Sequence, residues 1–380
     1  MSLRTRGAAA AVTVLFAMNG ALVGGFGGTL PALRERLGVG SGGVSVLLFC
    51  FAGAAVLSMQ AGGRLSDSLG ARAVVLVSAP VLASGILLLA FARSLPAAAA
   101  AVLLAGFGNG AMDVSMNALG VQVERARPRP VMSFFHAFFS IGNLSGAGVV
   151  VLVGQFRSGP GVVLPSLITI GLATLAAYAF VVRIVPRAEP VGHVRHSRRG
   201  LPAVAWALGA MAFSFGLAEG TAVDWSSIHV TDVARIDPAR GALGLVAVSG
   251  FMVPVRLCGD RAVAAFGRRR VVRFGGAVAV AGYLVVLTAT PLPVVLAGWA
   301  LVGLGVGMIA PQVYAAAGHA GGGRLLAVVV TFGYAAFLVG PAVIGTLVGW
   351  IGVQHAMALP LALAGVIVVL ARSLPDEARS

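Results

Sequence analysis

The sequence predicts an all-α membrane protein with twelve transmembrane helices in two pseudo-symmetric six-helix bundles. Of its 380 residues, 58% are apolar and only 10% are charged, whereas soluble domains carry about 25% charged residues. Apolar runs long enough to cross a bilayer follow one another along the chain, and the two halves share a glycine pattern. Such a chain must expose its apolar side chains to lipid, where helices satisfy their own backbone groups.

The expected spans follow the apolar runs, since about 20 residues cross the hydrocarbon core. They lie at residues 7–29, 44–63, 73–92, 97–119, 131–153, 162–185, 202–223, 241–258, 273–290, 294–316, 325–346 and 355–371. The first run is longer than the apolar region of a signal peptide, so we expect a membrane helix there. The 53 glycines suit close packing and bending of helices in lipid.

The distribution of arginine predicts the orientation. All 27 basic residues are arginine, and the formal net charge is +15. With the N-terminus in the cytoplasm, 21 arginines fall in inner segments and 6 in outer segments. This positive-inside bias places both termini in the cytoplasm. Nucleic acid is not an expected partner, because no basic patch with interleaved aromatic residues occurs.

An arginine-rich segment, PRAEPVGHVRHSRRG at 186–200, follows the sixth run. We expect an N-terminal bundle at 1–185, a cytoplasmic linker at 186–201 and a C-terminal bundle at 202–380. His193 and His196 lie in the linker among arginines, so a solvated loop is expected there and no metal site.

The two halves resemble each other in sequence. The segment AGFGNGAMD (105–113) corresponds to VGLGVGMIA (302–310), with three glycines at an offset of 197 residues. Gly142-Asn143 corresponds to Gly340-Pro341 at an offset of 198. A parallel repeat of this kind indicates a transporter with a central site between its halves.

The loop after the second run contains GRLSDSLGAR, residues 63–72. This resembles the motif G-x-L-x-D-x-x-G-x-R of the major facilitator superfamily, and the second half has a modified copy, GDRAVAAFGRRR, at 259–270. The resemblance implies a cytoplasmic gate in which a carboxylate pairs with arginines, and opening separates the pair. The corresponding residues here are Gly63, Asp67, Gly70, Arg72, Asp260, Arg261 and Arg268.

Three further segments narrow the resemblance. They are DVSMNA (113–118), FHAFFSIG (135–142) and AEGTAVDWS (218–226), which resemble the MosC-like bacterial permeases. An acid followed four residues later by asparagine, as at Asp113 and Asn117, also resembles the fucose-permease branch. The resemblance implies a monomeric transporter of the bacterial inner membrane whose first, fourth, seventh and tenth helices line the cavity.

Asp113, His136 and Glu219 are the proton-coupling candidates. A carboxylate inside the membrane costs about 2.5–3.5 kcal/mol on insertion scales, so Asp113 is expected to face the bundle interior, near His136 or Asn117. It could exchange a proton, accept hydrogen bonds from solute hydroxyls, or act as a structural clamp. We expect Glu219 near the outer end of the seventh helix, with Asp224 and Trp225 beyond it. An outer loop is the alternative for both acids.

The substrate-binding candidates are polar or aromatic residues of the apolar runs and their ends, with helix–helix hydrogen bonding as the alternative role. They are Asn19, Asn117, Asn143, Gln312, Tyr314, Tyr334 and Trp225. With these helix bounds no arginine lies deep in any helix. That favours a neutral or cationic solute over an anion, and a sugar or polyol suits the asparagines.

The predicted function is secondary active transport of a small polar solute by alternating access, with proton-coupled symport expected. The alternative is a proton-coupled exporter of a metabolite or drug, although Gly142-Asn143 stands where drug antiporters carry Gly-Pro. The sequence contains no H-E-x-x-H, G-x-S-x-G or Walker pattern, so neither an enzyme nor a cofactor is expected. The expected partners are the solute, protons and the lipid bilayer.

Overall fold

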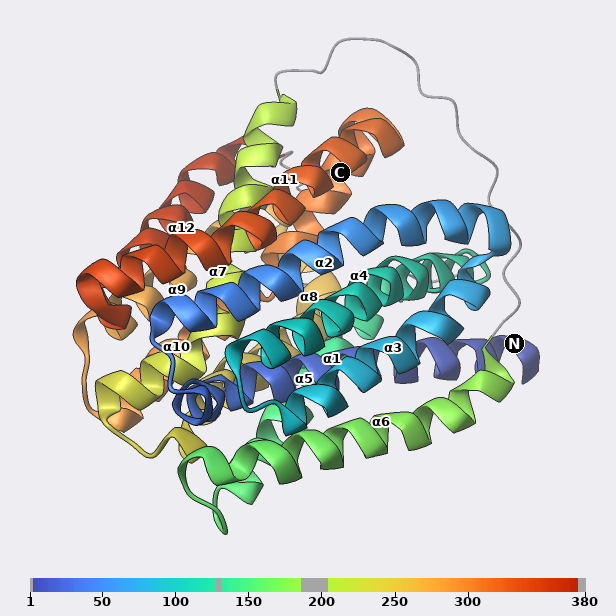
Figure 1. The fold of residues 1–380 in the computed structure, drawn as a ribbon. Coiled ribbons are helices and arrows are strands. Elements are labelled where there is room, and N and C mark those ends of the chain that lie inside the picture. Colours follow the sequence, from blue (N-terminus) through green and yellow to red (C-terminus); the bar gives the residue numbers. More distant parts are fainter. Residues whose placement is uncertain (1–2, 128–130, 186–203, 375–380) are drawn as a thin grey trace. The chain divides into compact units, whose positions relative to one another are not determined.

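The computed structural model describes residues 3–127, 131–185 and 204–374, which form helices and no strand (Figure 1). The predicted linker at 186–201 lies outside these residues. The first half forms α1 (Leu3–Leu37), α2 (Ser41–Leu69), α3 (Ala71–Phe91), α4 (Leu95–Arg125), α5 (Met132–Val153), the short helix η1 (Gly159–Val162) and α6 (Val163–Ile184). The second forms α7 (Val204–Ala234), η2 (Pro238–Arg240), α8 (Leu243–Phe266), α9 (Arg268–Thr288), α10 (Leu292–Val306), α11 (Ile309–Ala356), α12 (Ala358–Leu370) and η3 (Ala371–Ser373).

The all-α class and the twelve main helices are therefore as predicted. Among the described residues, ten helical stretches are long and apolar enough to cross a membrane. The 13-residue α12 and α7, which contains two of the predicted acids, are not among the ten.

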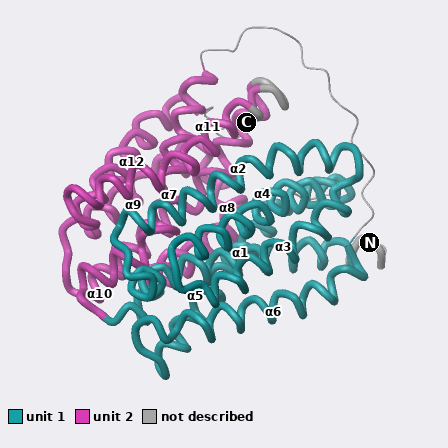
Figure 2. The backbone as a smooth tube through the Cα atoms, viewed as in Figure 1, with its two compact units in different colours: residues 1–194, 237–243 teal, residues 195–236, 244–380 magenta. Residues whose placement is uncertain are grey.

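The chain forms two compact units (Figure 2). The first comprises Met1–Val194 and Asp237–Leu243, and the second comprises Arg195–Ile236 and Gly244–Ser380. The short segment after α7 belongs to the first unit because Asp237 is bonded there. Its Oδ1 accepts hydrogen bonds from the backbone N–H of Gly159 at 2.9 Å and of Ala239 at 2.8 Å.

Several helices are longer than the apolar runs that predicted them. α7 continues to Ala234, where the sequence predicted an end at 223, and α8 continues to Phe266, where it predicted an end at 258. Hydrophobicity detects only the lipid-facing length of a helix. Helical hydrogen bonding continues past it wherever polar side chains find partners inside the protein.

α11 contains the end of the predicted tenth span and the whole of the predicted eleventh, yet the chain reverses within it. A Cβ placed on Gly333 would lie 2.5 Å from the hydroxyl oxygen of Tyr314. In a straight helix these 19 positions would be about 28 Å apart. The two candidate spans, Leu292–Ala320 and Val328–Ala356, lie on either side of the reversal.

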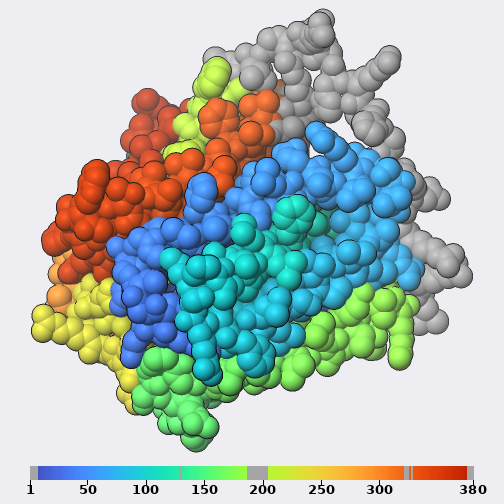
Figure 3. All heavy atoms as spheres, viewed as in Figure 1, coloured from blue at the N-terminus to red at the C-terminus, as the bar shows by residue number. Residues whose placement is uncertain are grey.

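Contacts of α4 with α2 and α3 recur in the second unit at the predicted offset of 197. A Cβ on Gly106 would lie 2.2 Å from the carbonyl oxygen of Phe51, and one on Gly303 would lie 2.0 Å from that of Val248. Gly108 meets Leu82 in the same way that Gly305 meets Ala279. At these crossings the backbones leave no room for a side chain, and α4 packs along both α2 and α3. Figure 3 shows one face of the molecule, on which the blue to teal segments of the first unit adjoin one another. The internal repeat is therefore present in the packing of each unit.

The turns between paired helices repeat as well. Gly70 joins α2 to α3 with φ +85°, and Gly267 joins α8 to α9 with φ +81°. Each donates its N–H to a helical carbonyl four residues back, on Ser66 and Val263. Because side chains are strained at such φ values, both turns require glycine.

We expect Gly106→Ala and Gly303→Ala to destabilise the protein by about 1–3 kcal/mol each, because either methyl group would overlap a backbone carbonyl. The matched controls are Gly148→Ala and Gly365→Ala, whose methyl groups would meet no atom within 4 Å. Thermal unfolding of the purified variants in detergent measures the effect. Equal melting temperatures for all four variants would contradict the packing described.

Candidate functional site

A stripe of polar side chains runs along one edge of α4. Asn109, Asp113 and Asn117 follow one another at intervals of four residues, so they share a face of the helix. All three are half-buried. The side-chain amide of Asn117 donates to Asp113 Oδ1 at 3.2 Å and to the Asp113 carbonyl at 2.8 Å. The stripe therefore offers a carboxylate with an amide attached to it.

The stripe also connects α4 to α1. Asn19, which is 2% exposed, donates from Nδ2 to Asn109 Oδ1 at 3.1 Å. The next residue on α4, Gly110, faces α2, where a Cβ would lie 2.0 Å from the Ala55 carbonyl. The packing of Gly110 on α2 and the amide pair of Asn109 with Asn19 on α1 thus determine which way the stripe on α4 faces. Asn109 was not among the predicted residues, although its spacing of four from Asp113 was visible in the sequence.

The helix that carries His136 packs chiefly on α1. Gly142 of α5 abuts the Ala17 carbonyl, and Gly20 of α1 abuts that of Phe139. The ring of His136 meets Phe16 edge-on, with centroids 5.2 Å apart. The hydrogen-bond partner of Asp113 is Asn117, so of the two predicted partners the structure brings the amide to the carboxylate.

Asn143, another predicted residue of α5, is 2% exposed. Its backbone lies against Gly20 and Gly24 of α1. Asn143 therefore lies within the α1–α5 packing.

A buried ion pair joins α7 to α8 in the second unit. Arg256 Nη2 lies 2.8 Å from Glu219 Oε1, and the two side chains are 7% and 11% exposed. Arg256 Nε also donates to the Gly307 carbonyl at 3.4 Å. Two expectations were therefore wrong. Glu219 is midway along α7, not near its outer end, and an arginine does lie buried inside a helix.

The physical reason is that the two residues neutralise each other. Each charge alone would be costly inside a membrane helix, and pairing with hydrogen bonds offsets that cost. Sequence hydrophobicity scores Arg256 as a loop residue because it contains no information about a partner 37 positions away.

Two buried side chains, one from α9 and one from α10, hold α7 by hydrogen bonds. Tyr283 donates its hydroxyl to the carbonyl of Ala218, the neighbour of Glu219, at 2.5 Å. Trp299 Nε1 donates to His229 Nδ1 at 3.3 Å, so His229 Nε2 carries the proton and donates to the Val286 carbonyl at 3.1 Å. All three are fully buried. His229 was missed because α7 was expected to end before it.

Of the predicted gate residues, Gly70 lies in the turn between α2 and α3. Gly63 and Asp67 precede it in α2, Arg72 follows it in α3, and Asp260 and Arg261 lie inside α8, before the turn at Gly267. Asp67 is half-buried, whereas Asp260 and Arg261 are exposed. Arg72 donates to the Val182 carbonyl at 3.4 Å. Gly63, at the start of the motif, has room for a side chain, since a Cβ there would meet only Val114 at 3.9 Å.

Arg268, a predicted gate residue, contacts one of the predicted substrate-binding residues. It is 6% exposed at the start of α9 and donates from Nε to Gln312 Oε1 at 3.3 Å. The structure therefore places Gln312, a substrate-binding candidate, beside the turn that resembles the gate motif.

The remaining candidates lie on α7 and α11. Tyr314 and Tyr334 are half-buried, and Trp225 is 1% exposed. The Nε1 atom of Trp225 has no hydrogen-bond partner in the described part of the chain. No cluster of three potential metal ligands occurs among the described residues.

Comparison with known proteins agrees with this geometry. The family model described as Major Facilitator Superfamily matches residues 12–315. The chain belongs to this superfamily. Its members are transporters, and the chain is accordingly a secondary transporter of a solute.

The relatives include several bacterial membrane proteins. The chain is 35% identical to the uncharacterized transporter y4wD of Sinorhizobium fredii, over 87% of this chain and 89% of the relative. It is 28% identical to the membrane protein MosC of Rhizobium meliloti, over 97% and 90% of the two chains. The predicted resemblance to MosC is thus confirmed.

Solved structures share the fold at low identity. A mutant of the nucleoside transporter NupG matches with a TM-score of 0.72 and 13% identity, covering 95% of this chain and 97% of that one. FucP in the outward conformation matches with a TM-score of 0.66 and 15% identity, covering 96% and 97%. At these identities the likeness concerns the fold alone.

We expect Glu219→Gln and Arg256→Gln each to destabilise the protein by about 3–5 kcal/mol, because each leaves a buried charge without its counterion. The double variant should recover most of the loss, since it removes both charges. Thermal unfolding of the four proteins measures the coupling. Additive losses in the double variant would show that the two side chains do not depend on each other.

Proposed function

We propose that the protein moves a small, uncharged polar solute of the sugar or polyol type by proton-coupled symport. The polar stripe on α4 carries this proposal. Its amides and carboxylate present hydrogen-bond donors and acceptors at one helical edge, as a solute with several hydroxyl groups requires. Asp113 is the ionisable member of the stripe, and it is the residue we assign to proton exchange.

The buried Arg256 does not make an anionic solute the better candidate. A positively charged group would favour an anionic solute. Arg256, however, is paired with Glu219 at 2.8 Å, so the two side chains together carry no net charge. Arg268 is likewise engaged with Gln312. The pairing of Arg256 supports an uncharged solute more directly than the absence of a buried arginine expected from the sequence.

Asp113 can couple the two movements through its amide partner. When it is ionised, its oxygens accept hydrogen bonds from Asn117 and from solute hydroxyls. When it is protonated, the carboxyl becomes a donor and loses acceptor capacity. A site whose affinity depends on protonation moves solute and proton together if both states exchange between the two sides of the membrane.

The test uses purified protein in liposomes that contain a pH-sensitive dye. Sugars, polyols, nucleosides and amines are added outside, one class at a time, and the internal pH is recorded. We expect acidification with a sugar or polyol. Asp113→Asn should abolish it, because the side chain can no longer exchange a proton.

The matched control is Glu35→Gln, which removes an exposed carboxylate at the end of α1 and should leave acidification unchanged. Alkalinisation on adding solute would contradict symport and indicate proton antiport, as in an exporter. Solute exchange without any pH change would contradict proton coupling while leaving solute transport intact.

A further inference from the structure

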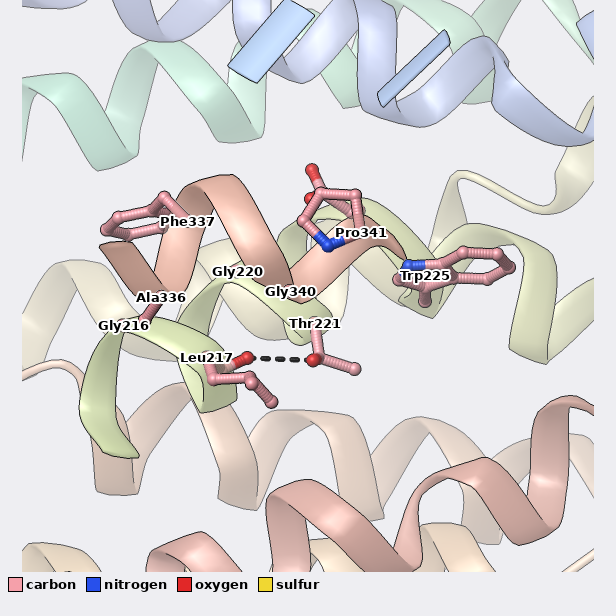
Figure 4. A pocket seen from close by; sticks show the side chains of 10 residues that line it. Gly216, Leu217, Gly220, Thr221, Trp225, Ala336, Phe337, Gly340 and Pro341 are labelled. Atoms are coloured by element: carbon pink, nitrogen blue, oxygen red, sulfur yellow. Dashed lines mark hydrogen bonds between the residues drawn. The ribbon is translucent and has the colours of Figure 1, made fainter. Parts of the chain in front are cut away.

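A small cavity lies between α7 and α11 of the second unit (Figure 4). It is lined from α7 by Gly216, Leu217, Gly220, Thr221, Asp224 and Trp225 and from α11 by Ala336, Phe337, Gly340 and Pro341. Its volume is about 10 Å³, counted as the space open to the centre of a water molecule. This is room for about one water molecule or one ion of similar size.

Two polar groups of the cavity lack partners within the described part of the chain. Asp224 is the sole ionisable residue of the lining, and the structure gives it no hydrogen bond or ion pair. The indole Nε1 of Trp225 is buried and has no acceptor. Because polar groups inside a membrane protein are normally satisfied, the carboxylate points to a missing cation or hydrogen-bond donor, and the indole N–H points to a missing acceptor such as a water molecule.

Two further oxygens belong to residues that line the cavity, the hydroxyl of Thr221 and the carbonyl of Phe337. The hydroxyl of Thr221 donates to the Leu217 carbonyl at 2.7 Å, as Figure 4 shows, so its lone pairs remain available. Pro341 has no N–H and cannot bond the carbonyl of Phe337 four residues earlier. Backbone carbonyls released in this way are typical ligands of coupling ions in transporters.

The residues that line the cavity differ from the corresponding residues of the first half. Gly20, Gly24 and Gly28 on α1 correspond, 196 residues later, to Gly216, Gly220 and Asp224 on α7. The carboxylate therefore stands where the first half has glycine.

The opposing helix differs too. A Cβ on Gly142 of α5 would lie 2.0 Å from the Ala17 carbonyl, so that crossing is closed. On its counterpart Gly340 a Cβ would meet only the Leu217 side chain, at 3.8 Å. The second half has an open space and a carboxylate where the first half is tightly packed.

We propose that this cavity binds one small monovalent cation, either a sodium ion or a proton held with one water molecule. A single carboxylate with neutral oxygen ligands is balanced by one positive charge. The charges around it support this, since α10 and α12, which pack on α7, carry no charged residue. Among the described side chains, the charged or titratable residues of α11 are Tyr314, His319, Tyr334 and His355, and η3, which also packs on α7, carries Arg372. None of these residues lines the cavity. The inference deepens the proposed function by locating a coupling ion, and only its role in transport rests on that function.

The experiment uses the fluorescence of Trp225 as a probe. Trp206 and Trp350, which are 64% and 80% exposed, are replaced by phenylalanine to reduce the background. Sodium chloride is titrated against choline chloride at constant ionic strength and fixed alkaline pH. The pH is then varied in choline chloride alone. We expect a saturable change with sodium or with protons, absent in Asp224→Asn.

A second variant guards against misfolding of Asp224→Asn. Gly340→Ala keeps the carboxylate and adds a methyl group at the cavity without a clash, so it should weaken binding by about tenfold or more. Gly365→Ala on α12 is the matched control and should bind normally. A response to sodium identifies a sodium site, and a response to pH alone identifies a proton site.

A response to neither ion would overturn the proposal, as would a full response in both Asp224→Asn and Gly340→Ala. The titration contains no solute. Its failure would therefore leave the proposed solute transport standing, and failure of the liposome test would leave the cation site standing.

Discussion

Close contact between glycine and the backbone of a neighbouring helix is the constraint on which each unit depends. In lipid, apolar side chains gain little by meeting one another, so association rests on close packing and hydrogen bonds. Gly106 and Gly110 bring α4 against α2, while Gly20 and Gly24 bring α1 against α5. The contacts of Gly106 and Gly110 fix the rotation of α4, and hence the edge along which its polar stripe runs. The position of the polar stripe therefore follows from the places where α4 carries glycine and a neighbouring backbone can approach closely.

The polar residues of α7 show how closely packed helices accommodate charged and polar side chains. Glu219 is neutralised by Arg256, and Tyr283 bonds the carbonyl next to it. His229 is held in a single tautomer between Trp299 and Val286. Each of these groups exchanges hydration for a specific partner, which keeps α7 helical across 31 residues despite its acids. Asp224 differs from them because the described chain supplies no partner.

Periodicity and composition were sufficient to predict the fold from the sequence, because lipid imposes helices of known length. The repeat was visible too, since Gly303 and Gly305 must recur where Gly106 and Gly108 do. The site was less accessible. Asp113 and Asn117 interact within one helix, so their spacing revealed them. Arg256 and Glu219 are 37 residues apart on different helices, and no local pattern reports that contact. His229 was not predicted because hydrophobicity ended the seventh helix at residue 223, whereas α7 continues to Ala234.

The two halves share a frame but differ in where they hold polar groups, and the difference has a physical origin. A glycine crossing can accept a polar side chain only where the opposing helix recedes. In the second half Pro341 removes one helical hydrogen bond and Gly340 leaves space, so α11 recedes from α7 at this level. A carboxylate at position 28 of the first half would meet Ala242 and Val150 at 3.2–3.3 Å from its Cβ. At position 224 it meets a cavity. A Gly-Pro pair on one helix and an aspartate on its neighbour are therefore one structural feature, because the space that the pair leaves accommodates the aspartate side chain.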